Sequence, residues 1–226
     1  MNDISKVTAR HLLRLEAVKL SPKAPFTWAS GWKSPIYCDN RVTLSDPEAR
    51  TYIKEALAET IRTHFPEVTA ISGVATGAIA QGALVADVME LPFSYIRSKA
   101  KDHGMGNQIE GRILPTDKVV VVEDLVSTGG SSLKAVEALR EFGCEVLGMV
   151  AIYTHGLQKA EDAFEEAGVT LRTLSCYDAV IEEAVASHYI SHDDLEMLRE
   201  WRKDLSLIHI SEPTRQDRPS RMPSSA

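Results

Sequence analysis

The sequence has few cysteines and no long apolar run, and both absences narrow the class of protein. The three cysteines among its 226 residues, Cys38, Cys144 and Cys176, are odd in number and far apart, so they predict neither a disulfide framework nor a cysteine-based metal site. No apolar run approaches the ~20 residues that a membrane-spanning helix requires. The first residues lack the basic start and apolar centre of a secretory signal. We therefore expect a cytoplasmic protein that does not interact with membranes.

Positive charge is also scarce. The chain has 25 Lys and Arg against 32 Asp and Glu, a formal net charge of −7, which argues against a general nucleic-acid-binding protein. Any anionic ligand must therefore be bound by a local group of residues. With 44% hydrophobic and 25% charged residues and no internal repeat, the composition excludes a disordered, collagen-like, coiled-coil or solenoid protein.

Strand and helix patterns alternate along most of the chain. The run KVVVVED at 118–124 is apolar without alternation, which is typical of a strand covered on both faces. Similar reasoning predicts strands at 69–74, 93–97, 145–153 and 169–175, and helices at 8–20, 47–63, 77–89, about 131–142 and 191–203. Repeated strand–helix–strand units predict an α/β fold, a parallel twisted sheet flanked by helices. Ligands bind such sheets beyond the carboxyl ends of the strands.

The two ends of the chain differ from this pattern. Residues 24–44 mix aromatics with Ser-Gly and Ser-Pro pairs, which predicts short strands broken by a turn around Gly31. Residues 205–226 are rich in Pro, Arg and Ser without periodicity. We expect one domain over 1–204, followed by a disordered or non-native tail.

The most informative segment is VVVVEDLVSTGGSS, residues 119–132. A buried strand ends at Glu123 and Asp124, and a turn of small residues at 127–131 presents backbone N–H groups at a helix start, where an anion is favoured. The two carboxylates suit the hydroxyls of a sugar or a bound magnesium ion. The segment therefore predicts a sugar-phosphate site, with an ordinary acidic strand end and flexible turn as the alternative. It contains neither a Walker phosphate loop nor the G-x-G-x-x-G dinucleotide fingerprint.

This segment resembles the phosphoribosyl pyrophosphate (PRPP) signature of the type I phosphoribosyltransferases. The resemblance implies that family's fold with a small N-terminal hood, formed mainly by residues 20–44. It also implies that Asp124 is catalytic and lies, with Glu123, near the ribose. The PRPP contacts implied by the signature are Glu123, Asp124, Leu125, Val126, Ser127, Thr128, Gly129, Gly130 and Ser131.

A basic loop covers residues 97–111. Arg97, Lys99, Lys101 and His103 concentrate positive charge, and three glycines give the segment the freedom of a mobile lid. On composition alone, a solvated charged loop is the alternative. The string RSKAKDHG resembles the catalytic loop of the orotate-specific members of the family. That likeness implies that Arg97, Lys101 and His103 contact PRPP, that Lys101 and His103 are catalytic, and that the loop reaches into the neighbouring site of a homodimer.

Two further segments resemble those members. GVATG at 73–77 is similar to their pyrophosphate loop, which implies contacts from Ala75, Thr76 and Gly77, although alone it is an ordinary glycine turn. FTWASGWKSPIYCDNR at 26–41 is similar to their hood over the orotate ring. The orotate contacts implied are Phe26, Ser30, Gly31, Lys33 and Tyr37, together with Ser127.

Two positions depart from the family pattern. Ala29 stands where many relatives place a lysine that contacts orotate, and His155 stands where some relatives place an arginine for the orotate carboxylate. The resemblance therefore does not say how this chain would hold the orotate carboxylate.

The resemblance implies transfer of the 5-phosphoribosyl group from PRPP to orotate, with Mg²⁺, to give orotidine 5-phosphate and pyrophosphate in pyrimidine synthesis. Two alternatives stay open. One is a phosphoribosyltransferase for a purine or uracil, against which the hood motif argues. The other is a regulator that keeps the pocket as an effector site. The acidic composition and the cations of the 97–111 loop argue against it.

Overall fold

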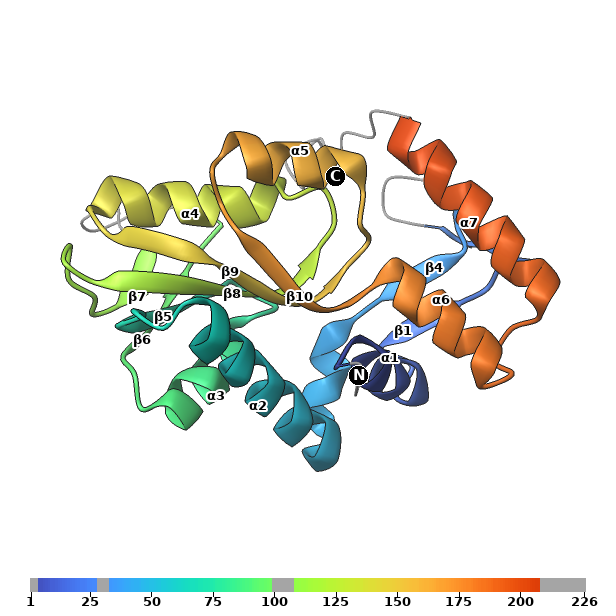
Figure 1. Cartoon of the computed structure of the whole chain (residues 1–226), viewed down its shortest axis with the longest axis horizontal. Helices are drawn as coiled ribbons and strands as arrows, with labels where there is room; N and C mark the ends of the chain where they lie inside the picture. Colours follow the sequence, from blue (N-terminus) through green and yellow to red (C-terminus); the bar gives the residue numbers. More distant parts are fainter. Residues whose placement is uncertain (1–3, 28–32, 99–107, 208–226) are drawn as a thin grey trace, which may run out of the picture.

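The computed structural model describes residues 4–27, 33–98 and 108–207, and a six-stranded sheet forms its centre (Figure 1). The strand order is β10-β9-β8-β5-β6-β7. The bounds are β5 (Ala70–Val74), β6 (Phe93–Ile96), β7 (Ile109–Gly111), β8 (Lys118–Val126), β9 (Glu145–Thr154) and β10 (Leu171–Cys176). All neighbours pair in parallel except β7, which is antiparallel to β6 at one edge. The predicted parallel α/β sheet is confirmed, with one antiparallel edge strand added.

Helices cover both faces of this sheet. α2 (Pro47–His64) and α3 (Ile79–Met89) lie on one face, and α4 (Gly130–Phe142) and α5 (Gln158–Glu166) lie on the other (Figure 1). Val120 and Val122 of β8 belong to the core under α2 and α3, whereas Val119 and Val121 belong to the core under α4 and α5. Because successive strand residues face opposite sides, both sets must be apolar, which explains the uninterrupted valine run.

The hood consists of short elements from the N-terminal part of the chain. They are α1 (Ile4–Arg14), β1 (Val18–Leu20), β2 (Phe26–Thr27), β3 (Lys33–Ser34), β4 (Ile36–Cys38) and the 3₁₀ helix η1 (Asn40–Ser45). β1 pairs with β4 and β2 with β3, both antiparallel. The short strands predicted for 24–44 are therefore confirmed, while the turn around Gly31 lies outside the described residues.

The helix predicted for residues 8–20 was wrong at its end. The chain leaves the helix after Arg14, Glu16 adopts a left-handed φ of 52°, and Val18–Leu20 forms β1. Val18 and Leu20 are buried on one side of that strand. Residues two apart share a face in a strand and not in a helix, and the segment pairs with β4.

The C-terminal part returns to the hood. α6 (Tyr177–Ala186), which the sequence did not predict, packs against α1, and α7 (His192–Leu207) follows it. Arg10 Nε lies 2.6 Å from Glu183 Oε1, and Ser175 Oγ donates to the carbonyl oxygen of Ser5 at 3.0 Å. α7 runs past residue 204 to Leu207, and the rest of the predicted tail lies outside the described residues.

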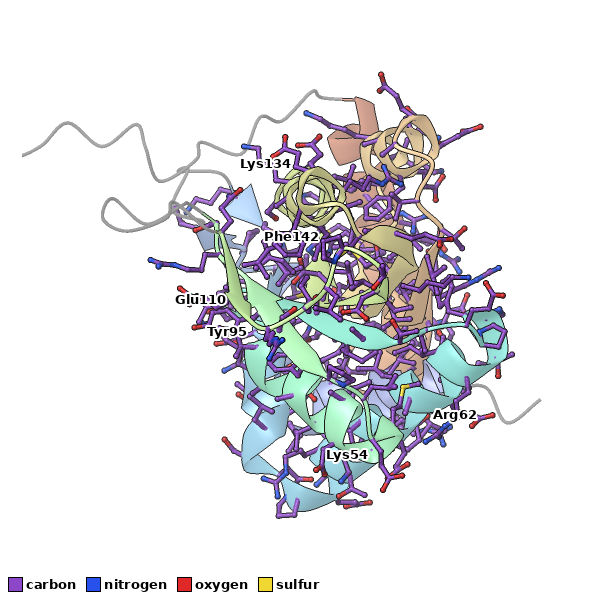
Figure 2. All side chains as sticks on the ribbon, turned by 90° about the vertical axis from the view of Figure 1, so that its left-hand side faces the viewer. Lys54, Arg62, Tyr95, Glu110, Lys134 and Phe142 are labelled. Carbon is purple, nitrogen blue, oxygen red and sulfur yellow. The ribbon has the colours of Figure 1, made fainter. Side chains whose placement is uncertain are left out.

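Figure 2 shows the sheet edge formed by β6 and β7, where the labelled residues Tyr95 and Glu110 are register partners. The predicted 97–111 loop was therefore too long at its end, because Ile109–Gly111 forms β7. The hairpin closes the rest of the loop at its base, where the backbone N–H of Arg97 donates to the carbonyl oxygen of Gln108 at 2.8 Å. None of the helices in the described ranges combines the length and apolar character needed to cross a bilayer.

Candidate active site

A pocket of about 330 Å³ opens at the carboxyl ends of β5 and β8, where a parallel sheet is expected to bind its ligand. Three segments line it: the end of the hood, the turn after β5 and the turn after β8. The lining residues are Cys38, Asp39, Asn40, Arg41, Val74, Ala75, Thr76, Gly77, Glu123, Asp124, Leu125, Ser127, Thr128, Gly129 and Ser131. The structure thus brings together the two turns that the sequence predicted to bind the two ends of one ligand.

Asp124 lies where the three segments meet. The side-chain amide of Asn40 donates to its carbonyl oxygen at 2.7 Å. Its carboxylate lies against the α-carbon of Gly77, and a β-carbon at that position would overlap it. Asp124 is half-buried and lines the pocket, so its carboxylate can face a bound sugar.

Glu123 also lines the pocket, but protein groups occupy its carboxylate. Only 4% of the residue is exposed. Ser132 Oγ donates to Glu123 Oε2 at 2.8 Å, and the Asp124 backbone N–H donates to Glu123 Oε1 at 3.0 Å. Burial, and then the charge of Asp124, raise the pKa of Glu123 well above its ordinary value. The buried carboxyl thereby joins the end of β8 to the first turn of α4.

The turn after β8 has the geometry of an anion site. Gly129, with φ of 82°, is the N-cap residue of α4, and no side chain accepts a hydrogen bond from the first N–H groups of that helix. N–H groups at an uncapped helix start favour an anion both by hydrogen bonding and through the helix dipole.

The turn after β5 forms the second backbone wall. The Ala75–Thr76 peptide bond is cis, and the Ala75 N–H donates to the carbonyl oxygen of Ile96 at 2.8 Å. α3 begins at Ile79, two residues later than the sequence predicted, and its N-cap residue Ala78 offers no side-chain cap. A second uncapped helix start therefore follows this wall of the pocket.

The cations predicted for the 97–111 loop lie apart from these walls or outside the described residues. Arg97 Nη1 is 3.4 Å from Glu110 Oε1 at the base of the loop, and Arg97 does not line the pocket. Lys99, Lys101 and His103 lie outside the described residues, so their contacts stay a prediction.

Of the described residues predicted to contact orotate, Ser127 lines the pocket. Phe26 and Tyr37 pack on each other with ring centroids 5.9 Å apart, and Lys33 Nζ donates to Thr27 Oγ1 at 2.7 Å; these three residues do not line it. Ser30 and Gly31 lie outside the described residues, as does Ala29.

His155 is buried rather than directed into this pocket. The residue is 7% exposed, and its Nδ1 lies 3.3 Å from the hydroxyl of Tyr153. Burial lowers the pKa of His155 to about 4, so the ring is neutral at pH 7. It therefore contributes no positive charge to ligand binding.

The sequence did not single out the four pocket residues at 38–41. Cys38 is a thiol whose pKa is raised by burial and then by Asp124, so it stays protonated. Asp39 and Arg41 form an ion pair, with Arg41 Nε 2.7 Å from Asp39 Oδ1. The string CDNR directly after a predicted strand is the signal that could have identified this wall.

The oxygen donors of the pocket suit a hard divalent cation, but they are few. Within the described residues, no three His, Cys, Asp or Glu side chains gather closely enough to hold a metal ion by themselves. Asp124 and Asp39 could complete the shell of an ion that a phosphorylated ligand brings with it.

Comparison with known proteins agrees with this geometry. Residues 44–188 match the phosphoribosyl transferase domain model. The chain is 62% identical over 203 residues to the orotate phosphoribosyltransferase of Porphyromonas gingivalis, covering 90% of this chain and 97% of that protein. It is 60% identical over 200 residues to the enzyme of the same name from Cytophaga hutchinsonii, covering 88% and 96%.

A solved structure supports the same assignment. The crystal structure of orotate phosphoribosyltransferase from Aeropyrum pernix matches with a TM-score of 0.70 and 28% identity, covering 81% of this chain and 99% of that one. The expected fold, with its sheet, flanking helices and pocket at the strand ends, is thereby confirmed. The chain belongs to the orotate phosphoribosyltransferase family.

Proposed function

We propose that this protein transfers the 5-phosphoribosyl group of PRPP to orotate, giving orotidine 5-phosphate (OMP) and pyrophosphate in pyrimidine nucleotide synthesis. The observation that carries the proposal is the pocket at the ends of β5 and β8. It combines an uncapped helix start after residue 129 with the carboxylate of Asp124. A phosphate and a sugar hydroxyl need this pairing of backbone donors and a carboxylate acceptor.

PRPP would lie across the three walls. Its 5-phosphate would bind the N–H groups of the 127–131 turn, and its pyrophosphate would bind the turn of Ala75, Thr76 and Gly77. The ribose would then face Asp124, because Asp124 lines the pocket together with both turns. Ser127 at the edge of the phosphate turn would contact the orotate ring.

The reaction develops charge of both signs, which the site is placed to stabilise. A ring nitrogen of orotate attacks the anomeric carbon as pyrophosphate leaves, so positive charge grows on the ribose and negative charge on the leaving group. Asp124 would stabilise the cationic ribose, with the buried Glu123 holding the strand end behind it. Arg97, Lys101 and His103 would neutralise the pyrophosphate, and closure of the loop would exclude water. We assign His103 a charge contact rather than a proton transfer.

Magnesium is the cofactor that we propose. Asp124 and Asp39 provide the hard oxygen donors that Mg²⁺ prefers, and the shortage of further protein ligands fits an ion that binds together with PRPP. When bound, it would supply positive charge that stabilises the leaving pyrophosphate.

We also propose a homodimer in which the 97–111 loop reaches the neighbouring site. The β6–β7 hairpin supports this idea, because its two strands lie at the edge of the sheet and carry the two ends of the loop. We keep residues 1–204 as the catalytic domain and leave the tail outside it. A cytoplasmic location completes the proposal, since the phosphorylated substrate is highly charged and does not cross membranes unaided.

The test is an ultraviolet assay of the full chain with orotate, PRPP and Mg²⁺. We expect orotate to be consumed, and chelation of the metal to stop its consumption. Parallel reactions with uracil, adenine and hypoxanthine test the alternatives. Consumption of one of these bases in preference to orotate would reassign the substrate, and PRPP binding without turnover of any base would favour an effector site.

A further inference from the structure

The end of the hood contributes a cation to the pocket. Among the described residues that line the pocket, Arg41 carries the sole positive charge, whereas Asp39 and Asp124 are acidic and burial favours the neutral form of Glu123. A base that carries its own carboxylate would be repelled by this acidic set unless a cation met it. Orotate is such a base, because it is uracil with a carboxylate on the ring.

The structure holds Arg41 firmly in place. Its Nε and Nη2 donate to the two carboxylate oxygens of Asp39 at 2.7 and 2.9 Å, and its backbone N–H donates to Asp39 Oδ1 at 3.2 Å. The backbone N–H of Asp39 in turn donates to the carbonyl oxygen of Ala17 at 2.7 Å. Asn40, between them, is anchored to the carbonyl oxygen of Asp124. The guanidinium is therefore oriented before any ligand arrives.

This ion pair leaves donors available for a second carboxylate. A guanidinium has five N–H groups in a planar fork, and the side chain of Asp39 engages Nε and Nη2. The Arg41 side chain remains 58% exposed, against 23% for Asp39. An arginine can thus bind its positioning carboxylate on one side and a planar ligand carboxylate on another.

The surroundings of Arg41 favour contact with the base rather than with the phosphate groups of PRPP. The pKa of Arg41 is raised first by the hydrogen bond to Asp39 and more weakly by Asp124 and Tyr37. Its guanidinium therefore lies within electrostatic range of Asp124, the carboxylate proposed to face the ribose, and of Tyr37 in the hood. The two turns proposed to bind the phosphate groups form separate walls. Two other basic residues are weaker candidates for binding the carboxylate of the base, because His155 is neutral and Lys33 bonds to Thr27 away from the pocket.

We infer that Arg41, oriented by Asp39, binds the carboxylate of orotate and so determines the preference of this site for orotate over uracil. This inference rests on the proposed function. No covalent step is involved, because the role is recognition of one ionised group by another.

The test compares two nucleotides that differ only in the carboxylate, OMP and UMP. Their affinities for the full chain are measured by titration calorimetry for the wild type, Arg41→Gln and Arg41→Lys. Arg172→Gln is the matched control, because Arg172 is exposed at the opposite end of the edge strand β10. Thermal unfolding of each variant checks that the fold is kept.

We expect Arg41→Gln to weaken OMP binding by about 10- to 100-fold, the range for a lost charge-assisted hydrogen bond, and to leave UMP binding nearly unchanged. Arg41→Lys should fall between, because it keeps the charge and loses the fork. Arg172→Gln should match the wild type. Equal losses for OMP and UMP, or unchanged OMP binding, would overturn the inference while the orotate assay of the wild type still succeeds. A wild type that binds neither nucleotide and consumes no orotate would overturn the proposed function itself.

Discussion

The side-chain amide of Asn40 donates to the carbonyl oxygen of Asp124 across 2.7 Å, although 84 positions separate the two residues in the sequence. The bond joins the end of the hood to the strand end that carries the pocket carboxylate. Asn40 is 1% exposed, so water does not compete for this bond. The hood therefore has a part in positioning Asp124 as well as in covering the pocket.

Replacing Asn40 by Ala should affect both stability and PRPP use. It leaves the Asp124 carbonyl without its buried donor, which should lower the free energy of unfolding by about 1–3 kcal/mol, measured by urea denaturation. It should also raise the KM for PRPP, because the strand end is released. Gln81→Ala is the control: Gln81 is equally buried and donates to Thr43 in the same 3₁₀ helix, away from Asp124. Equal KM values for the two variants would contradict the positioning role.

Gly77→Ala should impair catalysis through Asp124. The new methyl group would occupy the space of the Asp124 carboxylate and displace it. A shift of about 1 Å in a reacting group can cost about 10²-fold in rate, so we expect a comparable fall in kcat/KM for PRPP. The double variant with Asp124→Asn tests whether Gly77→Ala acts through the Asp124 carboxylate. If it does, the effects of the two substitutions on kcat/KM should be strongly non-additive.

The buried carboxyl of Glu123 predicts a dependence of stability on pH. Its folded pKa is raised, so the folded state holds this proton at pH values where the unfolded state has lost it. Stability contributed by Glu123 is therefore present below its unfolded pKa and lost as pH rises through the folded pKa. Glu123→Gln removes this loss and can keep partners for Ser132 and the Asp124 N–H. Unfolding curves from pH 5 to pH 8 should show the variant gaining on the wild type as pH rises, and a constant difference would contradict the raised pKa.

His155 predicts that, at lower pH, stability changes with pH in the opposite direction. Its pKa of about 4 in the fold is below the ordinary value of 6.5, so the unfolded state takes up the proton first as pH falls. Stability is then lost between pH 6.5 and pH 4, by up to about 3 kcal/mol at 1.36 kcal/mol per pKa unit. His155→Gln, which does not titrate, should show a flatter stability profile over this interval. An unchanged profile would indicate that other groups control the acid transition.

Lys101→Ala tests the cationic loop. We expect turnover to fall by about 10²–10³-fold, as for the loss of one donor to a developing negative charge, with an unchanged melting temperature. The assay is steady-state consumption of orotate with saturating PRPP. Turnover equal to that of the wild type would refute the role of the loop.

The sequence predicted the central sheet well because its signals there are strong. The valine run of β8 is apolar throughout since Val120 and Val121 pack in different cores. The segment Val18–Leu20 was harder, because three residues are too few to establish the two-residue period of a strand, and the strand is formed by pairing with the distant β4. The helices α5 and α6 were not predicted.

The candidate site was also predictable from the sequence only in part. The two turns were recognisable because glycines and small hydroxyl residues follow buried strands. Neighbouring acids in the sequence did not reveal that Glu123 is buried against Ser132 while Asp124 lies in the pocket. Arg41 was missed because its place in the pocket depends on how the hood folds onto the sheet, and the string CDNR after a predicted strand marks the wall without giving that arrangement.

The packing of α1 against α6 and β10 has a consequence for biosynthesis. Ser5 and Arg10 find their partners Ser175 and Glu183 only 170 and 173 positions later. A ribosome adding about 5–20 residues per second needs roughly 10–35 s to cover that distance. Throughout this interval the first helix can contact only β1, η1 and α2, and the surface that α6 and β10 add to its apolar side is still missing. The segment made first is therefore among the last to dock, and newly made chains become active only when nearly the whole polypeptide has emerged.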